Sequence, residues 1–176
     1  MKINNIDFKP YIDHDKLQAT VARMAQKIDR DYANTSLMVC PVLTGAFVFA
    51  ADLVRQLKSE CEISFVKYTS YEGMQSSGKV GCQMPFSEKM RGRHVLIVED
   101  VIDSGLSMAH MLQQVSTFEP CSVKVCTLFF KPNMFRQQFK PDYVGLEIAD
   151  DFIVGYGLDF DGKGRQLPDV WIANTK

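Results

Sequence analysis

The chain has 176 residues and a formal net charge of −1, with 46% hydrophobic and 23% charged residues. This length and composition predict one globular domain, spanning 1–176. The nearly balanced charge excludes the overall basic bias of nucleic-acid-binding proteins, so we expect no nucleic-acid partner. No stretch has the length and apolarity of a membrane span, and we expect neither a membrane partner nor a signal peptide.

Hydrophobic periodicity predicts helices and strands that alternate along the chain. Apolar residues spaced by four, three and four predict a helix that includes Leu17, Val21, Met24 and Ile28. Two further helical patterns occupy 46–58 and 106–117, and apolar runs predict strands at 36–43, 61–70, 94–98, 122–130, 142–148 and 152–156. The alternation predicts an α/β fold with a doubly wound, mostly parallel sheet. The tail from Gly157 onward has the composition of a loop.

A long polar stretch lies between the second and third predicted helices. From Tyr71 to about Arg93 the periodicity fades, and the stretch is rich in glycine and serine. Part of it fits a hairpin around Ser77-Gly78, with a return strand at Val80 and Cys82. A polar segment this long inside one domain is either a disordered loop or a functional flap, and composition alone does not separate the two.

The five cysteines indicate the redox state of the protein. They are odd in number and lack CxxC spacing, at positions 40, 61, 82, 121 and 126. This pattern fits a disulfide or zinc framework poorly and predicts a reduced, cytoplasmic protein.

An acidic cluster follows the clearest strand, in the sequence VLIVEDVIDSGLSM from 95 to 108. In open α/β sheets ligands bind beyond the carboxyl ends of the strands, which is where Glu99 and Asp100 are expected. Neighbouring carboxylates repel each other and need hydrogen-bond donors, such as sugar hydroxyls, or a cation such as magnesium. The helix that begins after Asp103 and Ser104 has unpaired amides in its first turn, which predicts a phosphate site.

A simpler explanation of part of this cluster is helix capping. Asp103 or Ser104 alone would ordinarily be the N-cap of the following helix. Capping needs only one side chain, however, and leaves Glu99 and Asp100 unexplained. No GxxxxGK[ST] or GxGxxG motif is present elsewhere. The complete cluster therefore favours a sugar-phosphate site.

These 14 residues resemble the phosphoribosyl-pyrophosphate-binding signature of the type I phosphoribosyltransferases. Further segments resemble the hypoxanthine-guanine subgroup of that family and occur in family order: LTGAF at 43–47, SY at 70–71, FFKP at 129–132, and DFIVGYGLDF at 151–160 followed by Arg165. The resemblance covers most of the chain. It implies the type I fold, with a flexible flap at about 70–85 and a small hood formed by the terminal segments, including about 150–176.

The resemblance implies transfer of a 5-phosphoribosyl group from phosphoribosyl pyrophosphate to hypoxanthine or guanine. This purine-salvage reaction yields IMP or GMP and pyrophosphate. Asp103 would accept or shuttle the proton of the base, and Lys131 would donate to its 6-oxo oxygen. Phe152 would stack on the base, and Ile153 would present backbone groups to its edge. As alternatives, Lys131 is an ordinary exposed lysine and FIVGY is a core strand.

The resemblance also implies how the sugar phosphate and the leaving group are held. The 5-phosphate would bind at the helix start, at Ser104, Gly105, Leu106 and Ser107. The ribose hydroxyls would bind to Glu99 and Asp100, directly or through Mg²⁺, and Asp159 would be a second metal-associated acid. Pyrophosphate would bind at Leu43, Thr44, Gly45 and Arg165, and the flap would contribute Ser70 and Tyr71.

This chain departs from the family at one of these positions. The family often has lysine or arginine where this chain has Thr44, so we expect that position to act through its backbone. A plain strand-to-helix turn with Thr44 as the N-cap explains LTG as well.

Two other functions remain open on the same fold. One is transfer to another base, such as xanthine, adenine, orotate or uracil. The other is a non-catalytic regulator that senses phosphoribosyl pyrophosphate and binds nucleic acid, which would not need Asp103, Lys131, Phe152 and Asp159 together and should carry a basic face. Family members are commonly dimers or tetramers, and exposed apolar faces on an early helix would suit a homo-oligomer.

Overall fold

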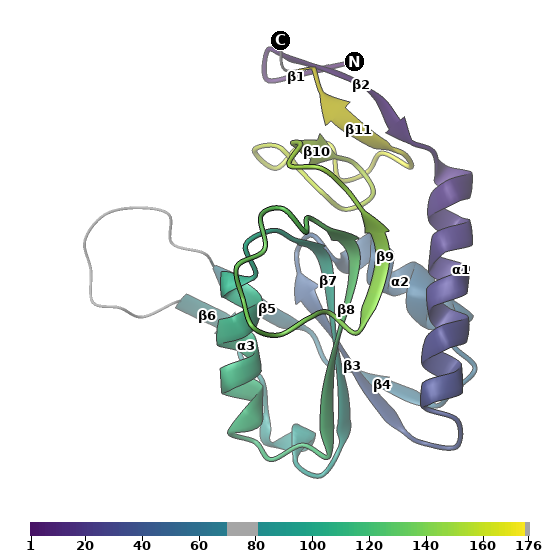
Figure 1. Ribbon diagram of the computed structural model, residues 1–176, viewed down its shortest axis with the longest axis vertical. Helices are drawn as coiled ribbons and strands as arrows, with labels where there is room; N and C mark the ends of the chain where they lie inside the picture. Colours follow the sequence, from purple (N-terminus) through teal and green to yellow (C-terminus); the bar gives the residue numbers. More distant parts are fainter. Residues whose placement is uncertain (70–80, 175–176) are drawn as a thin grey trace.

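A mostly parallel sheet of seven strands forms the centre of the described structure, in the order β6-β5-β3-β7-β8-β9 with β4 also paired to β3 (Figure 1). The structure is a computed structural model, and it describes residues 1–69 and 81–174. The strands are β3 Leu37–Leu43, β4 Cys61–Ile63, β5 Val66–Thr69, β6 Gly81–Met84, β7 His94–Ile102, β8 Ser122–Phe130 and β9 Tyr143–Glu147. Only the pairing of β5 with β6 is antiparallel. The predicted α/β fold is confirmed.

Helices cover both faces of this sheet, which makes it doubly wound (Figure 1). Helices α1 (His14–Asp31) and α2 (Phe47–Gln56) pack on one face, and α3 (Leu106–Ser116) packs on the other. A short 3-10 helix, Glu88–Met90, precedes β7. None of the described helices is long and apolar enough to cross a membrane.

The core on each face follows from the two-residue repeat of the strands. In β3, Leu37 and Val39 pack toward α1 and α2, whereas Met38 and Cys40 pack toward α3, because successive side chains of a strand point to opposite faces. Both faces are buried, which explains the nearly continuous apolar runs.

The apolar stripe of α1 belongs to this core. Leu17, Val21, Met24 and Ile28 are all buried, because α2 and β9 pack against the helix. The expectation of an exposed apolar face on an early helix is therefore wrong for α1.

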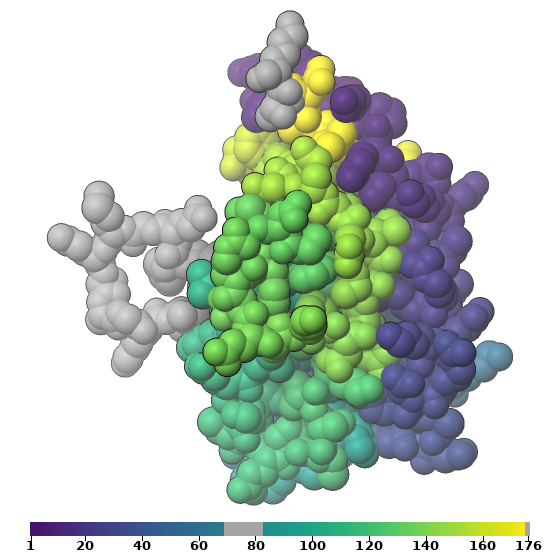
Figure 2. Space-filling view, in the orientation of Figure 1, coloured from purple at the N-terminus to yellow at the C-terminus, as the bar shows by residue number. Residues whose placement is uncertain are grey.

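The two ends of the chain meet in a second, antiparallel sheet, the hood. Its strands lie in the order β1 (Lys2–Ile3), β2 (Ile6–Ile12), β11 (Val170–Ala173) and β10 (Ile153–Val154). Figures 1 and 2 show the purple N-terminal and yellow C-terminal segments together at one end of the molecule. The predicted hood is thus present, but the loop prediction for the tail is wrong at Val170–Ala173. This short strand forms because β2, from the other end of the chain, pairs with it, which no local pattern reveals.

Several strand boundaries also differ from the prediction. Strand β7 continues through the acidic pair to Ile102, because β8 pairs with it along that length, up to Phe130. The strand predicted at 61–70 is interrupted and forms β4 and β5, which both pair with β3. The predicted return strand is present as β6, while Ser77-Gly78 lies outside the described residues.

Candidate functional site

The carboxyl end of β7 and the start of α3 enclose a pocket of about 330 Å³. Its walls are formed by Glu99, Val101, Ile102, Asp103, Ser104, Gly105, Leu106, Ser107 and Met108. All of the predicted phosphate-binding residues therefore line the same hollow as the first acid of the cluster. The pocket lies at the carboxyl end of parallel strands, where open α/β sheets bind their ligands.

The start of α3 presents free amides to this pocket. The N-cap is Gly105, with a φ of 79° and no side-chain hydrogen bond, so neither Asp103 nor Ser104 is the N-cap. The Ser104 hydroxyl accepts only a long hydrogen bond of 3.4 Å from the Leu106 N–H. Within the described residues, the N–H groups of Gly105 and Ser107 donate to no other group. Unpaired amides at a helix N-terminus form a ready site for a phosphate.

The two acids at the end of β7 are half-buried and adjacent to each other. Burial raises the pKa of both carboxyl groups, and the negative charge of Asp100 raises the pKa of Glu99 further. Each carboxylate accepts a nearby backbone N–H, that of Asp100 for Glu99 and that of Val101 for Asp100. Neither forms an ion pair with any described lysine, arginine or histidine. The pair therefore has unused acceptor capacity for hydroxyl groups or a cation.

The loop after β3 packs tightly between Asp100 and the hood. A Cβ on Gly45 would lie 1.7 Å from Asp100 Oδ2, and a Cβ on Gly157 would lie 2.3 Å from the Gly45 carbonyl oxygen. Both contacts are possible only because the two residues have no side chain. Gly45 thus brings the hood and the acidic pair together.

The loop after β3 has an irregular backbone with a free N–H group. The peptide bond between Leu43 and Thr44 is cis. The N-cap of α2 is Ala46, without a side-chain hydrogen bond, so the alternative of Thr44 as the N-cap is wrong. The Gly45 N–H has no hydrogen-bond partner among the described residues and can donate to an anion.

Arg165 is held in the hood by three contacts. Its Nη1 donates to the Gly157 carbonyl at 2.7 Å, and its Nη2 lies 2.6 Å from Asp159 Oδ1. The Gly157 N–H in turn donates to the Arg165 carbonyl at 3.0 Å. Arg165 is therefore fixed beside the glycine that touches Gly45, close enough to Asp100 for its charge to lower the pKa of that carboxyl group, although burial raises it more.

Lys131 lies between two carboxylates. Its Nζ is 2.9 Å from Asp103 Oδ1 and 3.6 Å from Asp150 Oδ1. Its backbone N–H donates to the Ile102 carbonyl at 3.0 Å, and its own carbonyl accepts from the Phe135 N–H at 3.2 Å. Lys131 is buried, so the alternative of an ordinary exposed lysine is wrong.

Phe152 offers an aromatic face at the edge of the hood. Its side chain is exposed by 46%, and its ring centroid lies 5.4 Å from that of Phe160 and 6.3 Å from that of Phe8. The next residue, Ile153, is buried in β10. The predicted strand at 152–156 is thus limited to the buried pair Ile153–Val154, and Phe152, which precedes it, is exposed.

The remaining predicted residues are not gathered in the same way. Ser70 and Tyr71 lie outside the described residues. Asp159 pairs with Arg165 and does not join Glu99 and Asp100 in one cluster. In residues 1–69 and 81–174, no three acidic, histidine or cysteine side chains are arranged to hold a metal ion.

Comparison with known proteins identifies the family. The model of the phosphoribosyl transferase domain matches residues 9–161. The chain belongs to this phosphoribosyl transferase family. Curated relatives include the hypoxanthine-guanine phosphoribosyltransferases of Mycobacterium avium, 38% identical over 87% of this chain and 79% of that protein, and of Bacillus subtilis, 33% identical over 93% and 92%.

Solved structures of phosphoribosyl transferases have the same fold. A hypoxanthine-guanine phosphoribosyltransferase from Bacillus anthracis has a TM-score of 0.88 at 37% identity and covers 97% of this chain and 98% of its own. A hypoxanthine phosphoribosyltransferase from Trypanosoma cruzi has a TM-score of 0.88 at 30% identity, covering 98% and 94%. The resemblance to this family is thereby confirmed.

Some contacts of this phosphoribosyl transferase were not predicted from the sequence. Asp150 and Gly157 lie in or beside the matched C-terminal block, but only the tertiary contacts show what they touch. Phe8 lies in a segment without any recognised signal, although the spacing of Ile6, Phe8 and Ile12 is that of one strand face. That spacing could have placed an aromatic residue in the hood.

Proposed function

We propose that this chain transfers the 5-phosphoribosyl group of phosphoribosyl pyrophosphate to hypoxanthine or guanine, giving IMP or GMP and pyrophosphate. The observation that carries the proposal is the pocket between β7 and α3. There, free helix amides and two half-buried carboxylates without cationic partners among the described residues lie beside an aspartate paired with a buried lysine. Relatives named for this activity support the choice of base.

The phosphoribosyl group matches the two halves of the pocket. The free N–H groups of Gly105 and Ser107 suit the 5-phosphate, with hydroxyls from Ser104 and Ser107 alongside. The carboxylates of Glu99 and Asp100 suit the ribose hydroxyls, which supply hydrogen-bond donors for their unused acceptor sites.

The leaving pyrophosphate requires positive charge and N–H donors. We assign these roles to the Gly45 N–H and to Arg165, with Leu43 and Thr44 shaping the loop. Glu99 and Asp100, and separately Asp159, would hold Mg²⁺, because the first two are half-buried acids with unused acceptor capacity. Bound magnesium would neutralise part of the negative charge of the departing oxygens.

We assign the purine to Asp103, Lys131, Phe152 and Ile153. The bond between the anomeric carbon and the pyrophosphate oxygen breaks while a bond to an imidazole nitrogen of the base forms, and Asp103 accepts the proton that the base loses. Lys131 donates to the 6-oxo oxygen, and Ile153 presents backbone groups to the base edge. Stacking on Phe152 contributes about 1–3 kcal/mol, by analogy with other nucleobase–aromatic contacts.

A spectrophotometric assay tests this function directly. The purified chain, magnesium and phosphoribosyl pyrophosphate are mixed with hypoxanthine, guanine, xanthine, adenine, orotate or uracil, one base at a time. We expect nucleotide only from 6-oxopurines. Turnover with another base alone would replace the proposed substrate, and no turnover together with retention of nucleic acid would favour the regulator.

Asp103→Asn separates proton transfer from binding. We expect turnover to fall by about 10²–10⁴-fold, the usual contribution of a general base, with little change in the dissociation constant of phosphoribosyl pyrophosphate measured by calorimetry. Equal losses in turnover and affinity would identify Asp103 as a binding residue only.

We also propose that the chain forms a cytoplasmic homodimer or homotetramer. Exposed Phe47, Ile63 and Phe65 supply apolar surface for self-association. Cys40, Cys61, Cys121 and Cys126 are free thiols, as expected in a reducing compartment. Light scattering coupled to size-exclusion chromatography measures the assembly, and a monomer at micromolar concentration would contradict it.

A further inference from the structure

We propose that Asp150 is a positioning residue for the purine, because it holds the Lys131 ammonium when Asp103 takes up the proton of the base. The inference rests on the proposed function and extends it to the residue that orients the selecting lysine. It concerns the base only and predicts no role for Asp150 toward the sugar phosphate.

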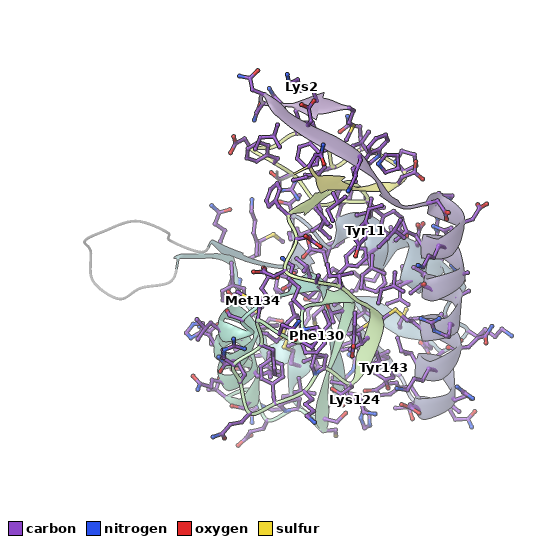
Figure 3. All side chains as sticks on the ribbon, turned by 45° about the horizontal axis from the view of Figure 1, so that its top comes forward. Lys2, Tyr11, Lys124, Phe130, Met134 and Tyr143 are labelled. Carbon is purple, nitrogen blue, oxygen red and sulfur yellow. The ribbon has the colours of Figure 1, made fainter. Side chains whose placement is uncertain are left out.

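The strand order brings the three residues together. Strands β7, β8 and β9 are parallel neighbours; Asp103 follows the first, Lys131 the second and Asp150 the third. The lysine therefore lies in the middle, with one carboxylate on each side at 2.9 and 3.6 Å. Figure 3 shows Phe130 and Met134, which precede and follow Lys131 in the chain.

Burial makes the ammonium depend on its partners. The Lys131 side chain is exposed by only 10%, whereas those of Asp103 and Asp150 are exposed by 52% and 57%. The carboxylates can be solvated by water, but the ammonium needs protein acceptors, because a buried unpaired charge is strongly unfavourable. Among the described residues, these two carboxylates are the only ion-pair partners of Lys131.

The proposed reaction removes one of these partners. When Asp103 accepts the proton of the base it becomes neutral, and its attraction for the ammonium falls. Asp150 is then the remaining negative group beside Lys131. A lysine ammonium has three donors and no acceptor, so one can stay on Asp150 while another reaches the 6-oxo oxygen.

Without Asp150, the Asp103 carboxylate would have both to hold the Lys131 ammonium and to accept the proton of the base. Lys131 would then pair with Asp103 alone, so the carboxylate that must take the proton of the base would also be the only one that holds the ammonium. The lysine would also lose the second contact that fixes its direction. Both effects weaken use of the base and leave the phosphate and ribose contacts intact.

The experiment compares Asp150→Asn with Asp151→Asn. The two variants remove the same formal charge from adjacent positions, but Asp151 makes no ion pair or side-chain hydrogen bond among the described residues. We expect Asp150→Asn to lower kcat/KM for hypoxanthine about fivefold, the upper range for an exposed ion pair. KM for phosphoribosyl pyrophosphate and the thermal midpoint should stay at their wild-type values, and Asp151→Asn should behave as wild type.

Restoring the carboxylate provides the second arm. Asp150→Glu should recover part of the loss for hypoxanthine, because a carboxylate is again available to Lys131. Equal kinetics of Asp150→Asn and Asp151→Asn would overturn the inference, as would parallel losses for base, phosphoribosyl pyrophosphate and thermal midpoint, which indicate a structural role. Both results leave the proposed function standing. If the wild-type chain were inactive on every base, the proposed function and the role of Asp150 would both be overturned.

Discussion

Gly45→Ala tests whether close packing between the loop after β3 and the acidic pair is needed for function. The added Cβ would lie 1.7 Å from Asp100 Oδ2 and 2.5 Å from its Cγ. Since close carbon–oxygen contacts are about 3.3 Å, the loop or the carboxylate must move by roughly 1.5 Å. The carboxylate cannot move freely, because it accepts the Val101 N–H at 2.9 Å. The loop cannot move freely either, because Gly157 packs on its other side.

This displacement gives two expected magnitudes. Overpacking of a tight contact lowers the free energy of unfolding by about 1–3 kcal/mol. A misplacement of about 1 Å in a reacting group costs about 10²-fold in rate, so we expect kcat/KM for hypoxanthine to fall by at least that factor. Urea unfolding and steady-state kinetics measure the two quantities on the same preparation.

Gly92→Ala is the matched control. Gly92 lies in the turn before β7 with a φ of +67°, and a Cβ there would meet nothing within 4 Å. This variant should lower stability by about 1 kcal/mol through backbone strain alone and keep full activity. If Gly45→Ala matched Gly92→Ala in kcat/KM, the contact between the loop and the acidic pair would have no role in the reaction.

Three further predictions concern buried charge and the aromatic face. Tyr156→Phe removes the 2.5 Å hydrogen bond that the Tyr156 hydroxyl donates to Asp52. Burial raises the pKa of Asp52, but its hydrogen bonds lower that pKa more. The stabilisation that ionised Asp52 gives the fold is therefore present above about pH 4, the ordinary range of the group, and is lost below it. Urea unfolding of Tyr156→Phe should therefore show a free energy of unfolding about 1.5–3 kcal/mol below wild type at pH 7, and the difference should become smaller in acid. A difference that does not change with pH would contradict the reasoning. Burial first, and the charge of Asp100 second, raise the pKa of Glu99, so ionised Glu99 destabilises the fold as pH rises through the raised value. Glu99→Gln should therefore raise the free energy of unfolding by about 0.5–2 kcal/mol at pH 8 without substrate, measured as a higher thermal midpoint, while turnover falls. A lower midpoint would refute this. Phe152→Ala should raise KM for hypoxanthine by about 5- to 150-fold, from the loss of about 1–3 kcal/mol of stacking. An equal rise in KM for phosphoribosyl pyrophosphate would show that the ring does not serve the base.

The sequence alone determined the local parts of this protein. The apolar spacing from Leu17 to Ile28 predicts a helix because it matches the helical period of 3.6 residues. The short, continuous apolar run at 94–98 predicts a strand that is buried on both faces. The stretch from Glu99 to Ser107 was recognisable because its functional groups are close together in the sequence. A strand, a turn and a helix start that follow one another in the chain are also neighbours in space.

The tertiary structure decided everything that depends on which distant segments meet. Val170–Ala173 becomes a strand only because β2 pairs with it, and Gly45 is confined only because Asp100 and Gly157 approach it from two sides. Lys131 is buried between Asp103 and Asp150 because β7, β8 and β9 lie side by side. A local pattern records which side chains point the same way, but contacts between segments also depend on sheet order and register, which are set by the packing of the whole chain.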